Sequence, residues 1–230
     1  MNHSIYLRFN QLKWLQEFRK GNIRFSCPLS YQDIENSAIG DKLEGVGVET
    51  ITISSPDRPP ELVKPIIQAL RYNILSDELK VTETYFYRNA HKDRILCLYK
   101  LDLEGDRIIN PVCIKNKGFD YDSFIVIDDI KQFFKHIKQH ISKSGNYTFK
   151  MDSVIYSNNS LNRGPFDKPS HQSYQNEFRL LITDNSICDF NNGEYTPLDV
   201  SLGNMSDLTS DIFDIDSLFT AKTIKDFRLK

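Results

Sequence analysis

The stretch YQNEFRLLI, residues 174–182, carries the strongest strand signal of the chain. From its fourth residue onward the side chains alternate, which places Glu177 and Arg179 on one face of the strand and Phe178 and Leu180 on the other. A carboxylate therefore opens a core strand, where it can be held at the mouth of a cleft. This position makes Glu177 the first candidate for chemistry.

Strands and helices of comparable clarity surround this segment. The predicted strands lie at residues 4–9, 22–27, 94–101, 107–114, 124–127 and 147–156, and predicted helices lie at 62–70 and 130–141. A further helix is predicted after Asn10, which can cap it; this helix shows Trp14, Leu15 and Phe18 on one side and ends at Gly21. No internal repeat or linker divides the chain. We therefore expect one α+β domain over residues 1–230, with a mixed, mostly antiparallel sheet and helices packed against it. The intervals 31–60 and 157–172 are predicted to be mobile loops.

Composition limits the partners and the compartment. The 230 residues include 29 Lys and Arg against 31 Asp and Glu, so no strong overall field attracts nucleic acid or anionic lipid. No apolar run approaches the ~20 residues that span a bilayer, and the N-terminal stretch lacks the apolar core of a secretory signal. The four cysteines form no CxxC pair, so neither a zinc ribbon nor a redox motif is indicated. We expect a cytoplasmic protein without a membrane partner.

Arg8 is the second candidate, because it interrupts an otherwise apolar strand. A guanidinium there can grip a phosphate through two parallel hydrogen bonds. Ser26 ends the following strand and is placed to contact the same ligand. The alternatives stay open: Arg8 as a surface arginine, Ser26 as a turn former, and Glu177 as a partner of Arg179 or a neighbouring lysine on a solvated face.

Two further constellations suit a metal ion. His136 and His140 stand four apart on a predicted helix, but the apolar stripe of that helix puts them on its lysine-rich outer side, so a solvated basic face is preferred and no metal site is predicted. Asp152 with Glu177 and Arg179 is loosely similar to a nuclease site built from Asp and Glu-x-Lys. Arginine, however, stands where lysine belongs.

Six segments of the chain together carry a resemblance to a known family. They are Tyr6–Phe9, Gly21–Phe25, Ile95–Tyr99, Pro165–Lys168, Tyr174–Arg179 and Leu202–Leu208. The distinctive part is the Tyr-Gln-x-Glu-Phe-Arg stretch with Phe-x-Lys upstream. These segments resemble an uncharacterised family of bacterial and phage proteins whose fold is associated with ADP-ribosyltransferases.

The resemblance implies an enzyme that uses NAD as a substrate and transfers ADP-ribose to a macromolecular target, a protein or a nucleic acid. It casts Arg8 as the contact to a phosphate or ribose of NAD and Glu177 as the catalytic carboxylate that stabilises positive charge on the ribose. Tyr174 or Tyr31 would stack on nicotinamide. The family's middle motif, a serine followed by a threonine, is not recognisable in this sequence.

An enzyme of this kind would act as a toxin or an anti-phage effector, with an antitoxin or immunity protein as its partner. The rival hypothesis is a noncatalytic interaction or sensor protein on the same scaffold, and a metal-dependent nuclease is the third. The placement of two residues separates them. The transferase hypothesis requires Arg8 and Glu177 in one pocket, and it fails if they face opposite sides of the sheet.

Overall fold

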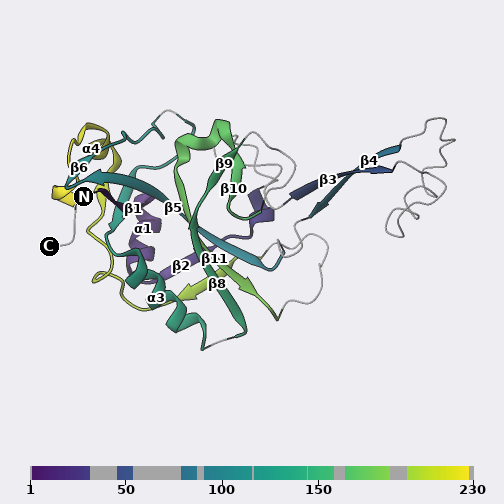
Figure 1. Ribbon diagram of the computed structural model, residues 1–230. Coiled ribbons are helices and arrows are strands. Elements are labelled where there is room, and N and C mark those ends of the chain that lie inside the picture. The colour runs from purple at the N-terminus through teal and green to yellow at the C-terminus, as the bar shows by residue number, and fades with distance from the viewer. Residues whose placement is uncertain are drawn as a thin grey trace.

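The computed structural model of the protein describes residues 2–31, 46–53, 79–86, 91–115, 117–143, 145–157, 164–186 and 196–227; of Asn2, Tyr31 and the segments 46–53 and 79–86 it describes the backbone alone. These residues form a mixed α+β structure around one large sheet (Figure 1). No helix among them is long and apolar enough to cross a membrane.

The large sheet is antiparallel throughout. Its strand order is β13-β7-β1-β5-β11-β8, and β6 pairs with the far end of β5. The strands are β1 (Asn2–Asn10), β5 (Asp93–Glu104), β6 (Arg107–Ile108), β7 (Ser123–Ile127), β8 (Tyr147–Ser153), β11 (Glu177–Asp184) and β13 (Phe213–Asp214). The strand that opens on Glu177 is therefore an inner strand, between β5 and β8.

Three short ribbons accompany this sheet. They pair β2 (Asn22–Phe25) with β12 (Leu198–Ser201), β3 (Val46–Ile53) with β4 (Leu79–Phe86), and β9 (Ile155–Ser157) with β10 (Asp167–Pro169). The β9–β10 pair is parallel. The helices are α1 (Leu12–Arg19), α3 (Ile130–Ile141), α4 (Ile215–Thr220) and three 3₁₀ turns, η1 (Pro28–Tyr31), η2 (Ser170–Gln175) and η3 (Lys225–Phe227).

Each face of the sheet has its own apolar core. Alternation along β1 sends Ile5 and Leu7 to one face, where α4 and η3 cover them. The other face packs against α1 and α3 through residues such as Leu15 and Phe133. In Figure 1 these two coverings lie on different sides of the sheet, with α4 above and α3 below. The two cores explain why β7, buried at every position, reads as a continuous apolar run.

The helix predicted over residues 130–141 is confirmed as α3. Asp129 caps it, because its carboxylate accepts hydrogen bonds from the backbone N–H groups of Lys131 and Gln132, both at 3.0 Å. The expected cap of α1 is wrong. Asn10 accepts only from Gln11, whereas the first N–H of the helix, on Leu12, donates to a distant carboxylate, Asp122, at 2.7 Å.

Several predicted bounds change in the structure. The strand expected over 107–114 is reduced to β6, and the strand expected over 147–156 breaks at Val154 into β8 and β9. Within the two intervals expected to be loops, 46–53 form β3, and 167–172 form β10 and the first half of η2. The helix expected over 62–70 lies outside the described residues.

Gly21 ends α1 as the sequence predicts, and its backbone makes a close approach that no other residue allows. Its φ is +90°, and a Cβ at this position would lie 1.9 Å from the carbonyl oxygen of Gly203. The Gly21 carbonyl also accepts a hydrogen bond from Leu202 at 2.9 Å. The end of α1 is thereby tied to the C-terminal part of the chain.

We expect Gly21→Ala to destabilise the protein by about 2–5 kcal/mol, because left-handed strain and a backbone clash add together. Gly105→Ala is the matched control: its φ is +59°, but nothing lies within 4 Å of the added Cβ, so strain alone should cost about 1–2 kcal/mol. Urea denaturation measures both. Equal losses in the two variants would show that the Gly203 contact contributes nothing.

Candidate functional site

Glu177 is set at the start of β11 by an unusual turn. The preceding residue, Asn176, ends η2 with a φ of +38°, in the left-handed region that Asn tolerates better than most residues. Its side-chain amide donates to the Lys100 carbonyl, and Lys100 N–H donates back to the Asn176 carbonyl at 2.8 Å. The Glu177 N–H then donates to the Tyr156 hydroxyl at 2.8 Å. These hydrogen bonds fix the backbone at Asn176 and Glu177 and therefore the direction in which β11 begins.

The carboxylate of Glu177 lies between two buried cations, and we call Glu177, Lys168 and Arg179 the charge cluster. Lys168 Nζ is 2.7 Å from Glu177 Oε1, and Arg179 Nε is 2.8 Å from Oε2. The three side chains are 12%, 5% and 1% exposed, respectively. Both carboxylate oxygens are therefore engaged away from bulk water. Arg179 contributes from the same strand, whereas Lys168 comes from β10.

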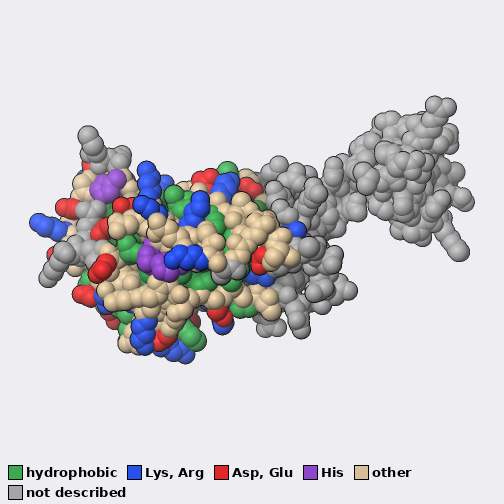
Figure 2. Space-filling view, turned by 90° about the horizontal axis from the view of Figure 1, so that it is seen from below, with side chains coloured by type: hydrophobic (Ala, Val, Ile, Leu, Met, Phe, Trp, Pro, Cys, Tyr) green, Lys and Arg blue, Asp and Glu red, His purple; other side chains and the backbone are tan. Residues whose placement is uncertain are grey.

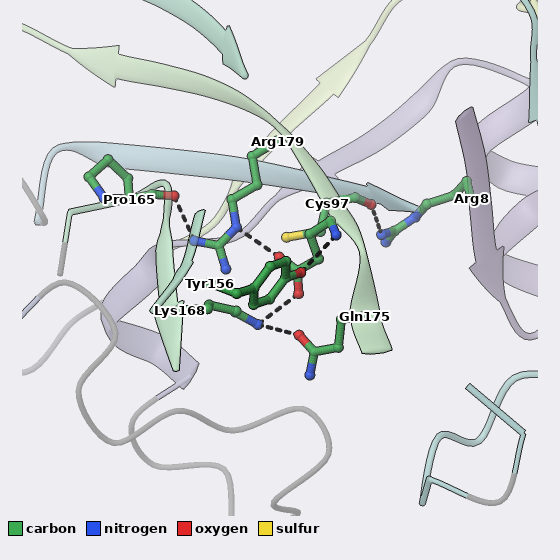
Figure 3. A network of polar contacts seen from close by, with 8 residues as sticks. Arg8, Cys97, Tyr156, Pro165, Lys168, Gln175 and Arg179 are labelled. Atoms are coloured by element: carbon green, nitrogen blue, oxygen red, sulfur yellow. Dashed lines mark hydrogen bonds and ion pairs between the residues drawn. The ribbon is translucent and has the colours of Figure 1, made fainter. Parts of the chain in front are cut away.

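Two neutral acceptors hold the cations in place. Lys168 Nζ also donates to Gln175 Oε1 at 2.6 Å, and Arg179 Nη1 donates to the Pro165 carbonyl at 2.6 Å (Figure 3). Charge-assisted bonds of this kind are stronger than neutral ones. Each cation therefore has an acceptor besides Glu177.

The two cations of the charge cluster determine the protonation state of Glu177. Burial on its own raises the pKa of Glu177, but the charges of Lys168 and Arg179 and their hydrogen bonds outweigh it and lower that pKa to about 2. Glu177 is thus ionised throughout the physiological range. Burial, reinforced by the Glu177 charge, raises the pKa of Tyr156, so this hydroxyl stays a neutral acceptor for the Glu177 N–H.

A small hollow beside the carboxylate, which we call the inner hollow, has a volume of about 70 Å³. Its lining combines aromatic and aliphatic side chains with three polar ones: Leu7, Phe9, Leu98, Tyr99, Ile114, Phe119, Tyr121 and Cys97, with Arg8, Gln175 and Glu177. Ligand pockets usually measure ~300–1,000 Å³. The inner hollow is therefore sized for a fragment of a ligand, not for a whole dinucleotide.

Arg8 reaches this hollow by an indirect route. Leu7, Tyr99 and Glu177 are paired in register across β1, β5 and β11, so their side chains share one face of the sheet. Arg8 follows Leu7 in β1, so its side chain leaves the opposite face. The β1–β5 ladder ends at Leu7, however, and the guanidinium extends toward β5, where Nη1 donates to the Cys97 carbonyl at 2.7 Å (Figure 3). The two residues thus line one hollow, as the transferase hypothesis requires, but their Cα–Cβ bonds point to opposite faces of the sheet, which is the arrangement named against it; the placement meets one half of that criterion and fails the other. No ion pair joins them.

A larger hollow lies against Arg8 as well, and we call it the outer hollow. It has a volume of about 560 Å³ and is lined by residues of β1, α1, β2, β5 and β12, among them Arg8, Trp14, Arg24, Ser26 and Asp199. The backbone of Ser26 is anchored to Ile95 by two hydrogen bonds, at 2.9 and 2.8 Å. Arg8 is shared by the two hollows. Ser26 belongs to the outer one and Glu177 to the inner one.

Tyr174, one of the two aromatic residues expected to stack on nicotinamide, lies elsewhere. Tyr174 lines neither hollow; its ring packs edge-on against Phe119 at 6.3 Å, with Lys117 Nζ 5.1 Å from its centroid. The side chain of Tyr31 lies outside the described part of the chain. The inner hollow is lined by other rings, among them Tyr121, which stacks on Phe119 at 5.0 Å.

Sequence reasoning missed Tyr121, Lys168 and Gln175. Tyr121 lies in a stretch with no regular structure, so periodicity gives no signal there. Lys168 and Gln175 both fall within the segments that carry the family resemblance, and that shared occurrence is a signal by which they could have been found.

The nuclease constellation does not assemble. Asp152 pairs in register with Arg179, but its side chain is 60% exposed and lies 3.9 Å from Lys150. Glu177 has both oxygens bound to cations, which repel a divalent ion. These two carboxylates therefore offer no common metal site.

The two helix histidines bind backbone carbonyls. Their rings lie 4.2 Å apart; His136 Nε2 is 3.2 Å from the Leu202 carbonyl oxygen, and His140 Nδ1 is 2.9 Å from the His136 carbonyl oxygen. Both are half-buried. On the face seen from below, charged side chains of both signs are interspersed with apolar ones (Figure 2), so this face presents no single-sign field for a nucleic acid backbone.

The chain matches no protein-family model, no curated protein and no solved structure.

The charge cluster predicts a specific acid response. The pKa of Glu177 in the folded state lies below its ordinary value of about 4.3, so its ionisation stabilises the fold above that pH, and this stabilisation is lost as the pH falls from about 4.3 toward 2. The double variant Lys168→Met with Glu177→Gln removes one charge of each sign. The free energy of unfolding of the wild type should therefore fall more steeply over this interval than that of the double variant.

Urea denaturation at a series of pH values from 5 to 2.5 measures this difference. Asp152→Asn is the control, because Asp152 is exposed and should leave the slope almost unchanged. Parallel curves for the wild type and the double variant would contradict the assignment of a buried, ionised Glu177.

Proposed function

We propose that the protein binds NAD and transfers its ADP-ribose to a macromolecular target. One observation carries the proposal: Arg8 and Glu177, 169 positions apart in the sequence, line the same hollow, and the carboxylate there is buried and ionised. A fixed negative charge beside an aromatic wall suits a reaction in which positive charge develops on a sugar ring.

The reaction breaks the bond between nicotinamide nitrogen and the ribose C1′. The electron pair of that bond leaves with nicotinamide, which departs as a neutral molecule, and positive charge develops on the ribose. Glu177 stabilises this charge, as carboxylates do in glycosyl transfer. A nucleophile of the target then bonds to C1′ and loses its proton.

The charges around the site suit the other half of the substrate. Arg8, Lys168 and Arg179 give three positive charges against the single negative charge of Glu177. This excess favours the pyrophosphate of NAD. Because Arg8 lines both hollows, a phosphate bound by Arg8 would be next to the hollow that holds Glu177 and next to the larger one.

Contact between Glu177 and a ribose requires the carboxylate to release one of its cations. Lys168 is assigned to move, because its ammonium group ends a flexible side chain and keeps Gln175 as an acceptor at 2.6 Å, whereas the planar guanidinium of Arg179 needs one fixed geometry. Arg179 is held by both Pro165 and Glu177 and is almost completely buried. We therefore assign Arg179 to hold the carboxylate and Lys168 to yield to the substrate.

One observation favours a second candidate, a noncatalytic binding or sensor protein. Both oxygens of Glu177 are engaged by cations, as expected of a structural ion pair. In that case Lys168 and Arg179 stabilise the fold, and the hollows bind a ligand without chemistry. The two candidates differ in whether nicotinamide is released.

The decisive comparison is between Lys168→Met and the double variant Lys168→Met with Glu177→Gln. Glu177→Gln alone leaves two buried cations without a counterion, which is strongly destabilising, whereas the double variant keeps the net charge of the wild-type cluster. We expect the double variant to release nicotinamide from NAD at least about 100-fold more slowly than Lys168→Met, as measured by chromatography of the reaction products.

Equal release by the two variants would remove the catalytic role of Glu177. A wild type that neither releases nicotinamide nor gains thermal stability near millimolar NAD would overturn the proposed function, because a ligand that binds the folded state raises its stability. Labelled NAD added to a cell lysate then identifies the target, a protein if the label is lost to protease and a nucleic acid if it is lost to nuclease. A toxin or anti-phage effector of this kind would act in the cytoplasm under the control of an antitoxin or immunity partner.

A further inference from the structure

The outer hollow has a large aromatic side chain at its rim. Trp14 lines the hollow from α1 and is 54% exposed, although its helix buries Leu15 and Phe18. The sequence places Trp14 on the same side of the helix as these two residues, but Trp14 is not buried with them. Its one ring contact among the described residues is a cation–π contact from Lys13, 5.1 Å from the centroid. An indole left open on a hollow is a stacking surface for a flat ring.

The same hollow contains one charge that the described residues do not neutralise. Arg24 is paired with Asp199 at 2.7 Å, and Glu17 accepts from Lys20 at 2.7 Å. Arg8 has no carboxylate within ion-pair distance in the described part of the chain, and the one hydrogen bond of its guanidinium there goes to the Cys97 carbonyl. Since a guanidinium carries five N–H donors, most of its capacity is available to a ligand.

We propose that the outer hollow binds a nucleotide, with its base stacked on Trp14 and its phosphate bound by Arg8. An aromatic ring joined to an anion satisfies both unpartnered features at once, and the volume of about 560 Å³ is within the range of ligand pockets. The inference rests on the proposed function, because it assigns the AMP half of NAD to the outer hollow and leaves the nicotinamide half to the inner one.

The chain provides its own reporter for this site, because Trp14 is its single tryptophan. Intrinsic tryptophan fluorescence therefore reports on the rim of the outer hollow alone. We expect AMP to quench it saturably. Adenosine, which lacks the phosphate, and inorganic phosphate, which lacks the base, should each bind at least about tenfold more weakly than AMP. Absence of saturable quenching by AMP would overturn the proposal.

Variants separate the two contributions. Trp14→Ala should weaken AMP binding about tenfold or more, whereas Trp14→Phe, which keeps a flat ring, should lose less; calorimetry replaces fluorescence for these variants. Leu12→Ala is the matched control, because Leu12 is 45% exposed on the same helix but does not line the hollow. Arg8→Gln should bind AMP no better than adenosine. Unchanged AMP affinity in Trp14→Ala would also overturn the proposal.

This result is independent of the reaction at Glu177. AMP has no bond to nicotinamide, so its binding is measured apart from the chemistry assigned to Glu177. If AMP binding depends on Trp14 while the wild type releases no nicotinamide, the nucleotide site is supported and the transferase function is contradicted. If nicotinamide is released while AMP binding does not depend on Trp14, the nucleotide site is contradicted and the transferase function is supported.

Discussion

The burial of Glu177 between Lys168 and Arg179 is the constraint on which the arrangement of this region depends. Removing a charge from water costs several kcal/mol unless it is paired and hydrogen-bonded. Arg179 lies two residues away and supplies one partner, but the second must come from outside the strand. The chain therefore returns over the sheet, and the parallel β9–β10 pair brings Lys168 to the carboxylate. The Pro165 carbonyl, on the same returning segment, accepts a hydrogen bond from Arg179.

A second constraint is the separation of β1 from β5. Beyond Leu7 and Tyr99 the two strands no longer pair, and β1 continues only with β7. Arg8 points toward this separation and donates a hydrogen bond to the Cys97 carbonyl; buried backbone acceptors need such donors. In doing so it lines hollows on both sides of the strand pair. The feature that satisfies a backbone group also places a cation where an extended anionic ligand would meet it.

These constraints serve both candidate functions, since a rigid charge cluster benefits a binding protein as much as an enzyme. The two candidate functions differ in the role of Glu177. In the transferase, this carboxylate would have to act on the substrate although Lys168 and Arg179 already neutralise it. Preorganised charges of this kind are effective in catalysis when the carboxylate replaces one of its contacts to a cation with a contact to the transition state. In the proposed reaction, the hydrogen bond from Lys168 to Gln175 would keep Lys168 paired during such an exchange.

The sequence alone determined what depends on local periodicity: the strand at β11, the helix α3, the stop at Gly21 and the shared face of Glu177 and Arg179. It could not determine which distant segments meet, because strand order is settled by packing over the whole chain. Only the tertiary structure joined Lys168 to Glu177, opened the sheet at Arg8 and left Trp14 exposed. An amphipathic pattern states which residues prefer burial, but the neighbours available on each face decide which of them achieve it.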